Sequence, residues 1–312
     1  MTLGELKARF SNEDACRKHL FRLRWPDGKV ACPRCGESKK VYARKTAEYR
    51  WTCKSCNKNG YGFSLTTGTV FEDTKLELRD WFQMLMLMLS SKKGMSALQI
   101  QRMVFGEHTN RQGKLLPNGS YESTWYACHR LRAAMRDPGF LRLTGHIEMD
   151  ETFVGGKAKN RHGGMFPSKR KRGAGPGGKH GKVAVVGAIA RKGNVVCQVI
   201  DRVSERTVGT FVDEVIGDRV SISTDQAKVY KHLDWESKDA KHESVNHLRG
   251  EFVRGAVHTA NLDSFWSLLK RGIIGTYHKV SKDHLPLYLN EFAFRHNNRN
   301  NPATFDRVLE SC

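Results

Sequence analysis

The sequence predicts a protein of mixed α+β and α/β class, in which a small β domain and a short helical segment precede a domain with a mixed sheet and flanking helices. Two Cys-x-x-Cys pairs interrupt short β-rich stretches between residues 29 and 72. Residues 73–143 then follow a helical hydrophobic pattern. From residue 144 onward, β-rich runs alternate with amphipathic stretches. These three observations predict the class and the order of the parts.

The chain as a whole is strongly basic. Its 312 residues include 53 Lys and Arg against 32 Asp and Glu, which gives a formal net charge of +21. Such an excess favours a polyanionic partner, first of all nucleic acid, although the charge could also serve only solubility. No stretch approaches the ~20 apolar residues of a membrane span, and the first residues lack the apolar core of a signal peptide. We therefore expect a cytoplasmic protein without a membrane partner.

Residues 1–28 are expected to form an N-terminal helical segment. Ser11 is a candidate N-cap for a helix over residues 11–24, because Glu13 and Asp14 fill the first turn, where the helix dipole favours negative charge. The stretch Trp25-Pro26-Asp27-Gly28 ends this helix, since Pro and Gly do not continue it.

Four of the eight cysteines have the spacing of a metal site within residues 29–72. Cys32-Pro-Arg-Cys35 and Cys53-Lys-Ser-Cys56 are separated by 17 residues. Each Cys-x-x-Cys turn offers two sulfurs, and two such turns complete a tetrahedral Zn²⁺ site. Disulfides are the alternative, but they are rare in the cytoplasm, and a redox Cys-x-x-Cys motif usually occurs singly. We therefore predict a zinc ribbon with one structural zinc ion held by Cys32, Cys35, Cys53 and Cys56.

Residues 73–143 are predicted to be helical. Helices over about 96–105 and 123–136 could form a helix-turn-helix, with Arg130, Arg132 and Arg136 reaching phosphates or base edges. The intervening loop, residues 106–120, is much longer than the 3–4-residue turn of that motif. A plain helical bundle is therefore an equal alternative to a DNA-binding segment.

Residues 144–300 are expected to form the largest domain. The pattern predicts strands at 146–154, 183–190, 194–201 and 219–224, and helices at about 204–216, 259–272 and 281–295. Residues 157–182 form a loop rich in Gly and basic residues. Its run Lys169, Arg170, Lys171 and Arg172 is expected to contact DNA.

Three aspartates lie on three separate elements of this predicted domain. Asp150 lies within a strand, Asp225 ends a strand, and Asp263 lies on a helix. This order is that of the RNase H-like fold, in which antiparallel strands bring such carboxylates together. Carboxylates are the ligands that two Mg²⁺ or Mn²⁺ ions need for cutting and joining phosphodiesters. Lys270, two helical turns after Asp263, would lie on the same helix face and could hold a phosphate.

Several stretches together resemble the ISXO-type insertion-sequence transposases of bacteria and archaea, which join an N-terminal zinc ribbon to a compact DDE domain. Besides both cysteine pairs, the matching stretches are Met149–Lys157, Ser223–Asp225, Phe252–Gly255, His258–Gly272, Gly275–His278 and Glu291–Arg299. The resemblance implies DNA transposition in the prokaryotic nucleoid: cleavage at the ends of the element, then attack of the freed 3′-hydroxyl on target DNA. The expected partners are double-stranded terminal inverted repeats and target DNA, bound by a homodimer or higher oligomer.

Carried over by position, Asp150 and Asp225 are the first two catalytic acids and metal ligands. The third position departs from the pattern, because similar proteins usually have Glu where Asp263 stands, and some use Asn. Asp263 is expected to be the third ligand, since it is anionic and in phase with Lys270, and Asn261 is the alternative. Arg271, beside Lys270, is expected to contact DNA.

A non-catalytic, zinc-dependent DNA-binding protein, either a regulator or a decayed transposase, is the alternative function. Both hypotheses predict salt-sensitive DNA binding, so only metal-dependent cleavage separates them. Residues 301–312 are expected to form a C-terminal tail.

Overall fold

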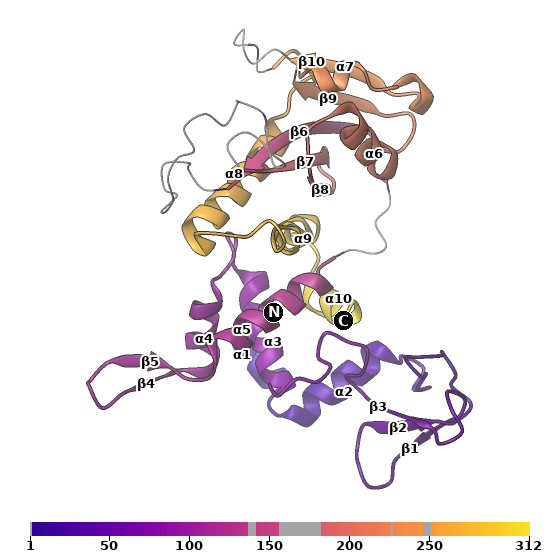
Figure 1. Ribbon diagram of the computed structural model, residues 1–312, viewed down its shortest axis with the longest axis vertical. Helices are drawn as coiled ribbons and strands as arrows, with labels where there is room; N and C mark the ends of the chain where they lie inside the picture. The colour runs from indigo at the N-terminus through magenta and orange to yellow at the C-terminus, as the bar shows by residue number, and fades with distance from the viewer. Residues whose placement is uncertain (1, 137–141, 156–181, 226, 246–250, 252) are drawn as a thin grey trace, which may run out of the picture. The chain divides into compact units, whose positions relative to one another are not determined.

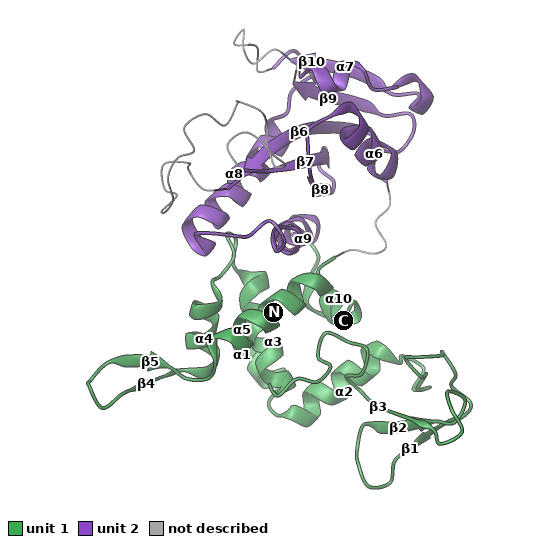
Figure 2. Ribbon diagram, in the orientation of Figure 1, with its two compact units in different colours: residues 1–136, 300–312 green, residues 137–299 purple. Residues whose placement is uncertain are grey.

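The computed structural model describes residues 2–136, 142–155, 182–225, 227–245, 251 and 253–312 (Figure 1). The chain divides into two compact units, residues 1–136 with 300–312, and residues 137–299 (Figure 2). Among the described helices, none combines the length and the apolar character needed to cross a membrane.

A bundle of helices forms the core of the first unit. Helix α3, which combines a buried aromatic pair (Trp81 and Phe82) with buried Met and Leu side chains, lies at its centre. Within the expected helical segment 1–28, the sequence predicts a helix only at 11–24. A separate helix, α1, precedes it and begins with a capping box of Thr2 and Glu5. The helices are α1 (Leu3–Arg9), α2 (Glu13–Arg24), α3 (Leu78–Ser90), α4 (Ala97–Phe105), α5 (Tyr121–Ala134) and α10 (Thr304–Glu310).

The C-terminal residues differ from the expected tail. Residues 304–310 form helix α10, which packs against α2, α3 and α5. Phe305 is buried and meets the ring of Phe82 edge-on, at 5.5 Å between centroids, while Asp306 lies 2.9 Å from His19 Nε2. The sequence pattern missed this helix because its apolar face is only two turns long.

The cysteine-rich part folds as a three-stranded antiparallel sheet of β1 (Val41–Ala43), β2 (Arg50–Cys53) and β3 (Tyr61–Ser64). Trp51 on β2 is buried between Phe63 on β3 and Trp25 at the end of α2, with ring centroids 5.8 and 5.2 Å away. This aromatic cluster anchors the small sheet to helix α2.

The long connection between α4 and α5 is a β-hairpin of β4 (Glu107–Thr109) and β5 (Leu115–Pro117), not the short turn of a helix-turn-helix. Its base is held by Asn118, whose Nδ2 donates to the carbonyl of Phe105 at 3.0 Å. The arginines expected at DNA are largely used inside the unit. Arg132 is buried, so the expectation that it reaches DNA is wrong, and Arg130 donates to the carbonyl of Glu72 at 2.9 Å.

The second unit is built on a five-stranded mixed sheet with the order β10-β9-β6-β7-β8. Strands β6, β7 and β8 pair antiparallel, whereas β9 pairs parallel with β6 and β10 pairs parallel with β9. The predicted strands 146–154 and 183–190 have the observed bounds, and β10 was not predicted. The strands are β6 (His146–Val154), β7 (Val183–Ala190), β8 (Val195–Ile200), β9 (Ser221–Asp225) and β10 (Lys241–Val245).

Helices cover both faces of this sheet. On one face, α6 (Glu205–Val215), α7 (Lys228–Lys231) and the 3₁₀ turn η3 (Glu236–Lys238) pack on a core that includes Ile147 and Met149 of β6. On the other face, α8 (Ala260–Gly272), the π-helical turn η5 (Ile273–Tyr277) and α9 (Leu285–Asn297) pack on Val154 and Val185. Because side chains alternate along a strand, the odd-numbered apolar residues of β6 point away from α8.

Gly187 on β7 allows helix α8 to approach the sheet closely. A Cβ added at Gly187 would lie 2.5 Å from the ring of Trp266 on α8, and Gly187 is the ladder partner of Asp150. We expect Gly187→Ala to destabilise the protein by about 1–3 kcal/mol, because Trp266 and α8 must move outward. Chemical denaturation measures this loss. Gly275→Ala, where an added Cβ meets nothing within 4 Å, is the control, and equal stability of both variants would contradict the packing argument.

Candidate functional site

The four predicted cysteines come together in the first unit. Their sulfurs all lie within 4.8 Å of one another, and among the described residues they are the one group of three or more potential ligands this close. The distances from Cys32 to Cys56 and from Cys35 to Cys53 are 3.6 and 3.7 Å. Two sulfurs at tetrahedral corners, each about 2.3 Å from zinc, are about 3.8 Å apart. The cluster therefore fits a structural zinc ion, with all four ligands supplied by the protein.

Backbone donors stabilise a thiolate in this cluster. Burial opposes ionisation of Cys32, but the N–H groups of Arg34 and Cys35 and the neighbouring thiols outweigh it and lower the pKa of Cys32 to about 7. Turns that point N–H groups at sulfur are suited to zinc, because the metal binds the thiolate form.

In the second unit, Asp150 and Asp225 lie on adjacent strands. The parallel pairing of β6 with β9 ends at Glu148 and Ser223, and Asp150 and Asp225 each follow this pair by two residues on their own strands. Asp225 is the last residue of β9, and its Oδ1 accepts a hydrogen bond from the N–H of Ala227 at 2.9 Å. The antiparallel arrangement expected for these strands holds only for β6, β7 and β8, because Asp225 comes from a parallel neighbour.

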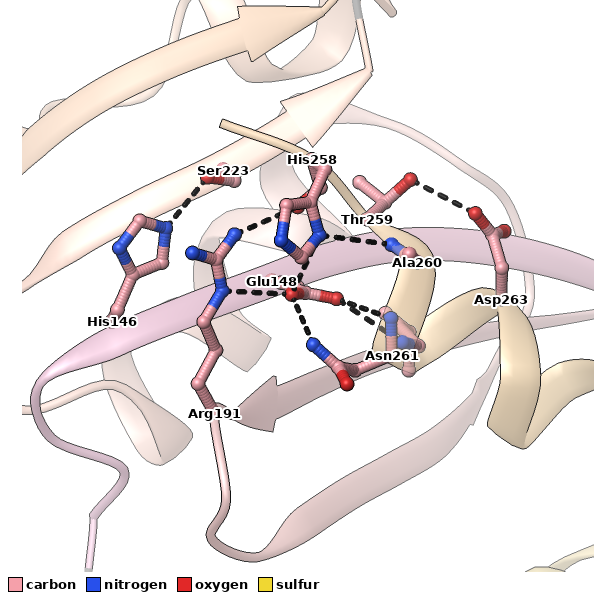
Figure 3. Close-up of polar contacts among 10 residues, drawn as sticks. His146, Glu148, Arg191, Ser223, His258, Thr259, Ala260, Asn261 and Asp263 are labelled. Carbon is pink, nitrogen blue, oxygen red and sulfur yellow. Dashed lines mark hydrogen bonds and ion pairs between the residues drawn. The ribbon is translucent and has the colours of Figure 1, made fainter. Parts of the chain in front are cut away.

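Asp263 lies in the first turn of α8, which packs on β6 and β7. Its Oδ2 accepts a hydrogen bond from the hydroxyl of Thr259 at 3.1 Å (Figure 3). Burial, and then the negative charges of Glu151, Asp225 and Asp263, raise the pKa of Asp150 to about 7. The charges of Asp225 and Asp263 therefore reach Asp150 from a neighbouring strand and a helix, although the three carboxylates are less tightly grouped than the four sulfurs.

Asn261 and Asp263 point to different partners. The side-chain amide of Asn261 donates to Glu148 Oε1 at 2.7 Å, whereas Asp263 turns towards Thr259 (Figure 3). The two side chains diverge as helical geometry requires for residues two apart.

Two acidic residues near the site were not singled out from the sequence. Glu148 is fully buried and accepts hydrogen bonds from the start of α8. Glu151 faces the other side of β6, where burial and then the charge of Asp225 raise its pKa to about 7, next to the buried Tyr230. Strand alternation from Asp150 could have indicated Glu148, since the two residues share one face.

The basic residues expected at DNA have different outcomes. Lys270 and Arg271 are exposed on α8, and Arg271 Nε donates to the carbonyl of Ser267 at 3.2 Å. The run Lys169, Arg170, Lys171 and Arg172 lies outside the described residues.

Comparisons with known proteins agree with the resemblance. Residues 142–297, half of the chain, match the ISXO2-like transposase domain, and residues 11–59 match a transposase zinc-ribbon domain. The chain is 29% identical over 293 residues to an uncharacterized protein in transposable element ISH50 of Halobacterium salinarum, covering 92% of this chain and 91% of that protein. A solved simian T-cell lymphotropic virus intasome in complex with a PP2A regulatory subunit has a chain that aligns at TM-score 0.29 and 10% identity, covering 55% of this chain and 60% of that one.

The domain match confirms the predicted class, because a DDE transposase domain implies an RNase H-like fold and a divalent metal, and the five-stranded mixed sheet agrees with it. The zinc-ribbon match covers the segment that contains the four clustered cysteines. With both domains matched in this order, the chain belongs to the ISXO2-like family of insertion-sequence transposases.

Proposed function

We propose that this transposase cleaves DNA at the ends of its own insertion sequence and joins the freed 3′-hydroxyl to target DNA. The observation that carries the proposal is that Asp150, Asp225 and Asp263 belong to a central strand, the end of its parallel neighbour and the first turn of the helix that packs on β6 and β7. A basic protein that gathers acids at one place has assembled a site for cations, since such carboxylates otherwise repel one another.

The three carboxylates would hold Mg²⁺ or Mn²⁺, because hard oxygen ligands suit these ions. When bound, such metals lower the barrier by activating the attacking oxygen and stabilising the leaving oxygen. The donor set fits, since the charges of Asp225 and Asp263 are near enough to Asp150 to help burial raise its pKa to about 7. Rotation of Asp263 away from Thr259 would free both of its oxygens for a ligand role.

Basic residues would position the DNA. Lys270, exposed two turns after Asp263, would bind a DNA phosphate, and Arg271 and the run from Lys169 to Arg172 would hold neighbouring backbone. We further propose a homodimer or higher oligomer, because a transposase must hold two element ends. The same chemistry supports a nucleoid location in a prokaryotic cell.

A cleavage and strand-transfer assay tests this function. The substrate is DNA from the flanks of the gene that carries the terminal inverted repeats, with Mg²⁺, with Mn²⁺ or with neither. We expect metal-dependent products, a loss of about 10³-fold in Asp263→Ala, and a much smaller loss in Asn261→Ala, because only the carboxylate of Asp263 would bind metal.

Two results would contradict parts of the proposal. A larger loss in Asn261→Ala than in Asp263→Ala would assign the third position to Asn261. DNA binding without products in either metal, by protein that carries zinc, would support a non-catalytic regulator instead.

A further inference from the structure

The carboxylate of Glu148 is the most densely bonded buried charge near the site. The side chain is fully buried on β6 (Figure 3). Its Oε2 accepts hydrogen bonds from the backbone N–H of Asn261 at 2.9 Å and of Leu262 at 3.2 Å. Its Oε1 accepts from Asn261 Nδ2 at 2.7 Å and from Arg191 Nε at 2.9 Å, and lies 3.2 Å from His258 Nδ1. Every one of these donors belongs to another element of the second unit.

These contacts make Glu148 the N-terminal cap of α8. The residue at the usual cap position, Thr259, makes no capping hydrogen bond to the helix, because its hydroxyl donates to Asp263. The first N–H groups of a helix have no partner within the helix and carry the positive end of its dipole. A carboxylate from the neighbouring strand satisfies two of them. Arg191 and His258 offset the remaining cost of burying its charge.

Glu148 links the two elements that carry two of the proposed metal ligands. Asp150 follows Glu148 by two residues on the same face of β6, and Asp263 follows Leu262 in the first turn of α8. A single side chain therefore joins the strand of the first acid to the helix of the third, within one helical turn of both.

We propose that Glu148 is a positioning residue, which holds the first turn of α8 against β6 and thereby sets Asp263 relative to Asp150. The proposal rests on the proposed function for its consequence, metal binding by the two aspartates, whereas the cap itself can be measured without any metal. Glu148 itself is not a ligand, since both of its oxygens are occupied by backbone and side-chain donors of the protein.

The test compares Glu148→Gln with Glu291→Gln in the full-length, zinc-loaded protein. Gln keeps the size of Glu but presents an NH₂ group to the side-chain donors of Arg191 and Asn261. Glu291 is an equally buried glutamate of the same unit, bonded to the Tyr277 hydroxyl at 3.1 Å and paired with Arg295 at 3.3 Å. It controls for the general effect of neutralising a buried carboxylate.

Two measurements are made on each variant. Amide hydrogen exchange of α8 peptides, in zinc-loaded protein without added Mg²⁺ or Mn²⁺, reports whether the first turn of α8 stays hydrogen-bonded. Binding of Mn²⁺, followed by the loss of its free electron paramagnetic resonance signal, reports the spacing of the aspartates, with Asp150→Asn as the reference for unspecific binding.

We expect Glu148→Gln to speed exchange at the start of α8 and to weaken Mn²⁺ binding by about 10–100-fold, the range seen when groups behind metal ligands are changed. Glu291→Gln should leave both unchanged. Unchanged exchange in Glu148→Gln, or equal weakening of Mn²⁺ binding in both variants, would overturn the positioning role.

If the proposed function itself is wrong, Mn²⁺ binding by the wild-type protein shows it. Wild-type protein would then bind Mn²⁺ no better than Asp150→Asn, while exchange at α8 would still decide whether Glu148 holds the helix. If Glu148→Gln does not fold, Arg191→Gln is measured in its place. Arg191→Gln removes the 2.9 Å ion pair with Glu148 by changing a partly exposed side chain. It must likewise speed exchange at the start of α8 and weaken Mn²⁺ binding.

Discussion

Asp150→Asn is expected to lower metal-dependent cleavage and strand transfer by about 10³-fold, while DNA binding stays near the wild-type level. Asn preserves the shape of the side chain but removes an anionic ligand from the centre of the site, and a loss of ~4 kcal/mol of transition-state stabilisation corresponds to about this factor. The residues expected at DNA, Lys169–Arg172, Lys270 and Arg271, do not include the acids, so Asp150→Asn removes no expected DNA contact. Gel-based cleavage and DNA-binding titrations measure the two properties separately.

Asp283→Asn, an exposed aspartate before α9, is the control and should retain full activity. Products from Asp150→Asn at the wild-type rate would refute the assignment of Asp150 as a catalytic ligand. A parallel loss of DNA binding would instead indicate a folding defect, which circular dichroism detects.

Asp150→Asn, although it lowers activity, should raise the stability of the metal-free fold. Burial and the surrounding acids raise the pKa of Asp150 from 3.8 to about 7, so the folded protein holds this proton more tightly than the unfolded chain does. Ionisation therefore destabilises the metal-free fold as pH rises from about 4 to 7, and the penalty is complete above pH 7. Asn carries no charge, so the stability advantage of Asp150→Asn should grow from pH 5 to pH 8 by on the order of 2 kcal/mol. Thermal unfolding of the zinc-loaded protein at the two pH values, without added Mg²⁺ or Mn²⁺, measures it, and a pH-independent difference would contradict ionisation of Asp150 as the cause.

Loss of zinc is expected to unfold the cysteine-rich part of the first unit. The three strands there contain only 3, 4 and 4 residues, so they cannot form a stable sheet without the metal. Structural zinc supplies about 10–16 kcal/mol of folding free energy in small domains. Cys53→Ser, or a strong chelator, should abolish stoichiometric zinc binding and leave residues 29–72 open to rapid hydrogen exchange and proteolysis.

The control is Cys312→Ser, which changes a cysteine of the same unit outside the cluster. It should bind zinc normally. The second unit should keep its exchange pattern in both variants, since its sheet and helices have their own cores. Slow exchange within residues 29–72 of zinc-free Cys53→Ser would show that the ribbon does not depend on the metal.

The sequence predicted those features that depend on neighbouring residues. Strands 146–154 and 183–190 were predicted with their observed bounds, because each is a β-prone run bounded by glycine, Gly145 and Gly155 around the first and Gly181 and Gly193 around the second. The four zinc ligands were predicted for the same reason, since Cys-x-x-Cys spacing is itself a local geometry.

Other features depend on contacts between distant segments. Strand β10 and helix α10 are short: β10 is defined by its pairing with β9, and α10 packs on helices far away in the sequence. Arg132 looked like a DNA contact because a charged residue on a helix is usually exposed, yet the packing of α5 buries it. The hairpin between α4 and α5 likewise depends on Asn118 reaching back to Phe105.

By itself, the sequence predicted a zinc ribbon ahead of an RNase H-like domain, the four clustered cysteines, and Asp150 and Asp225 as candidate acids, because period, spacing and motif are properties of the chain. The tertiary structure alone decided that Asp225 comes from a parallel strand, that Asn261 turns to Glu148, and that Glu148 caps the helix of Asp263. The physical reason is that a buried carboxylate takes whatever donors the fold brings to it. Which donors these are depends on how strand β6 and helix α8 pack, more than a hundred residues apart in the sequence.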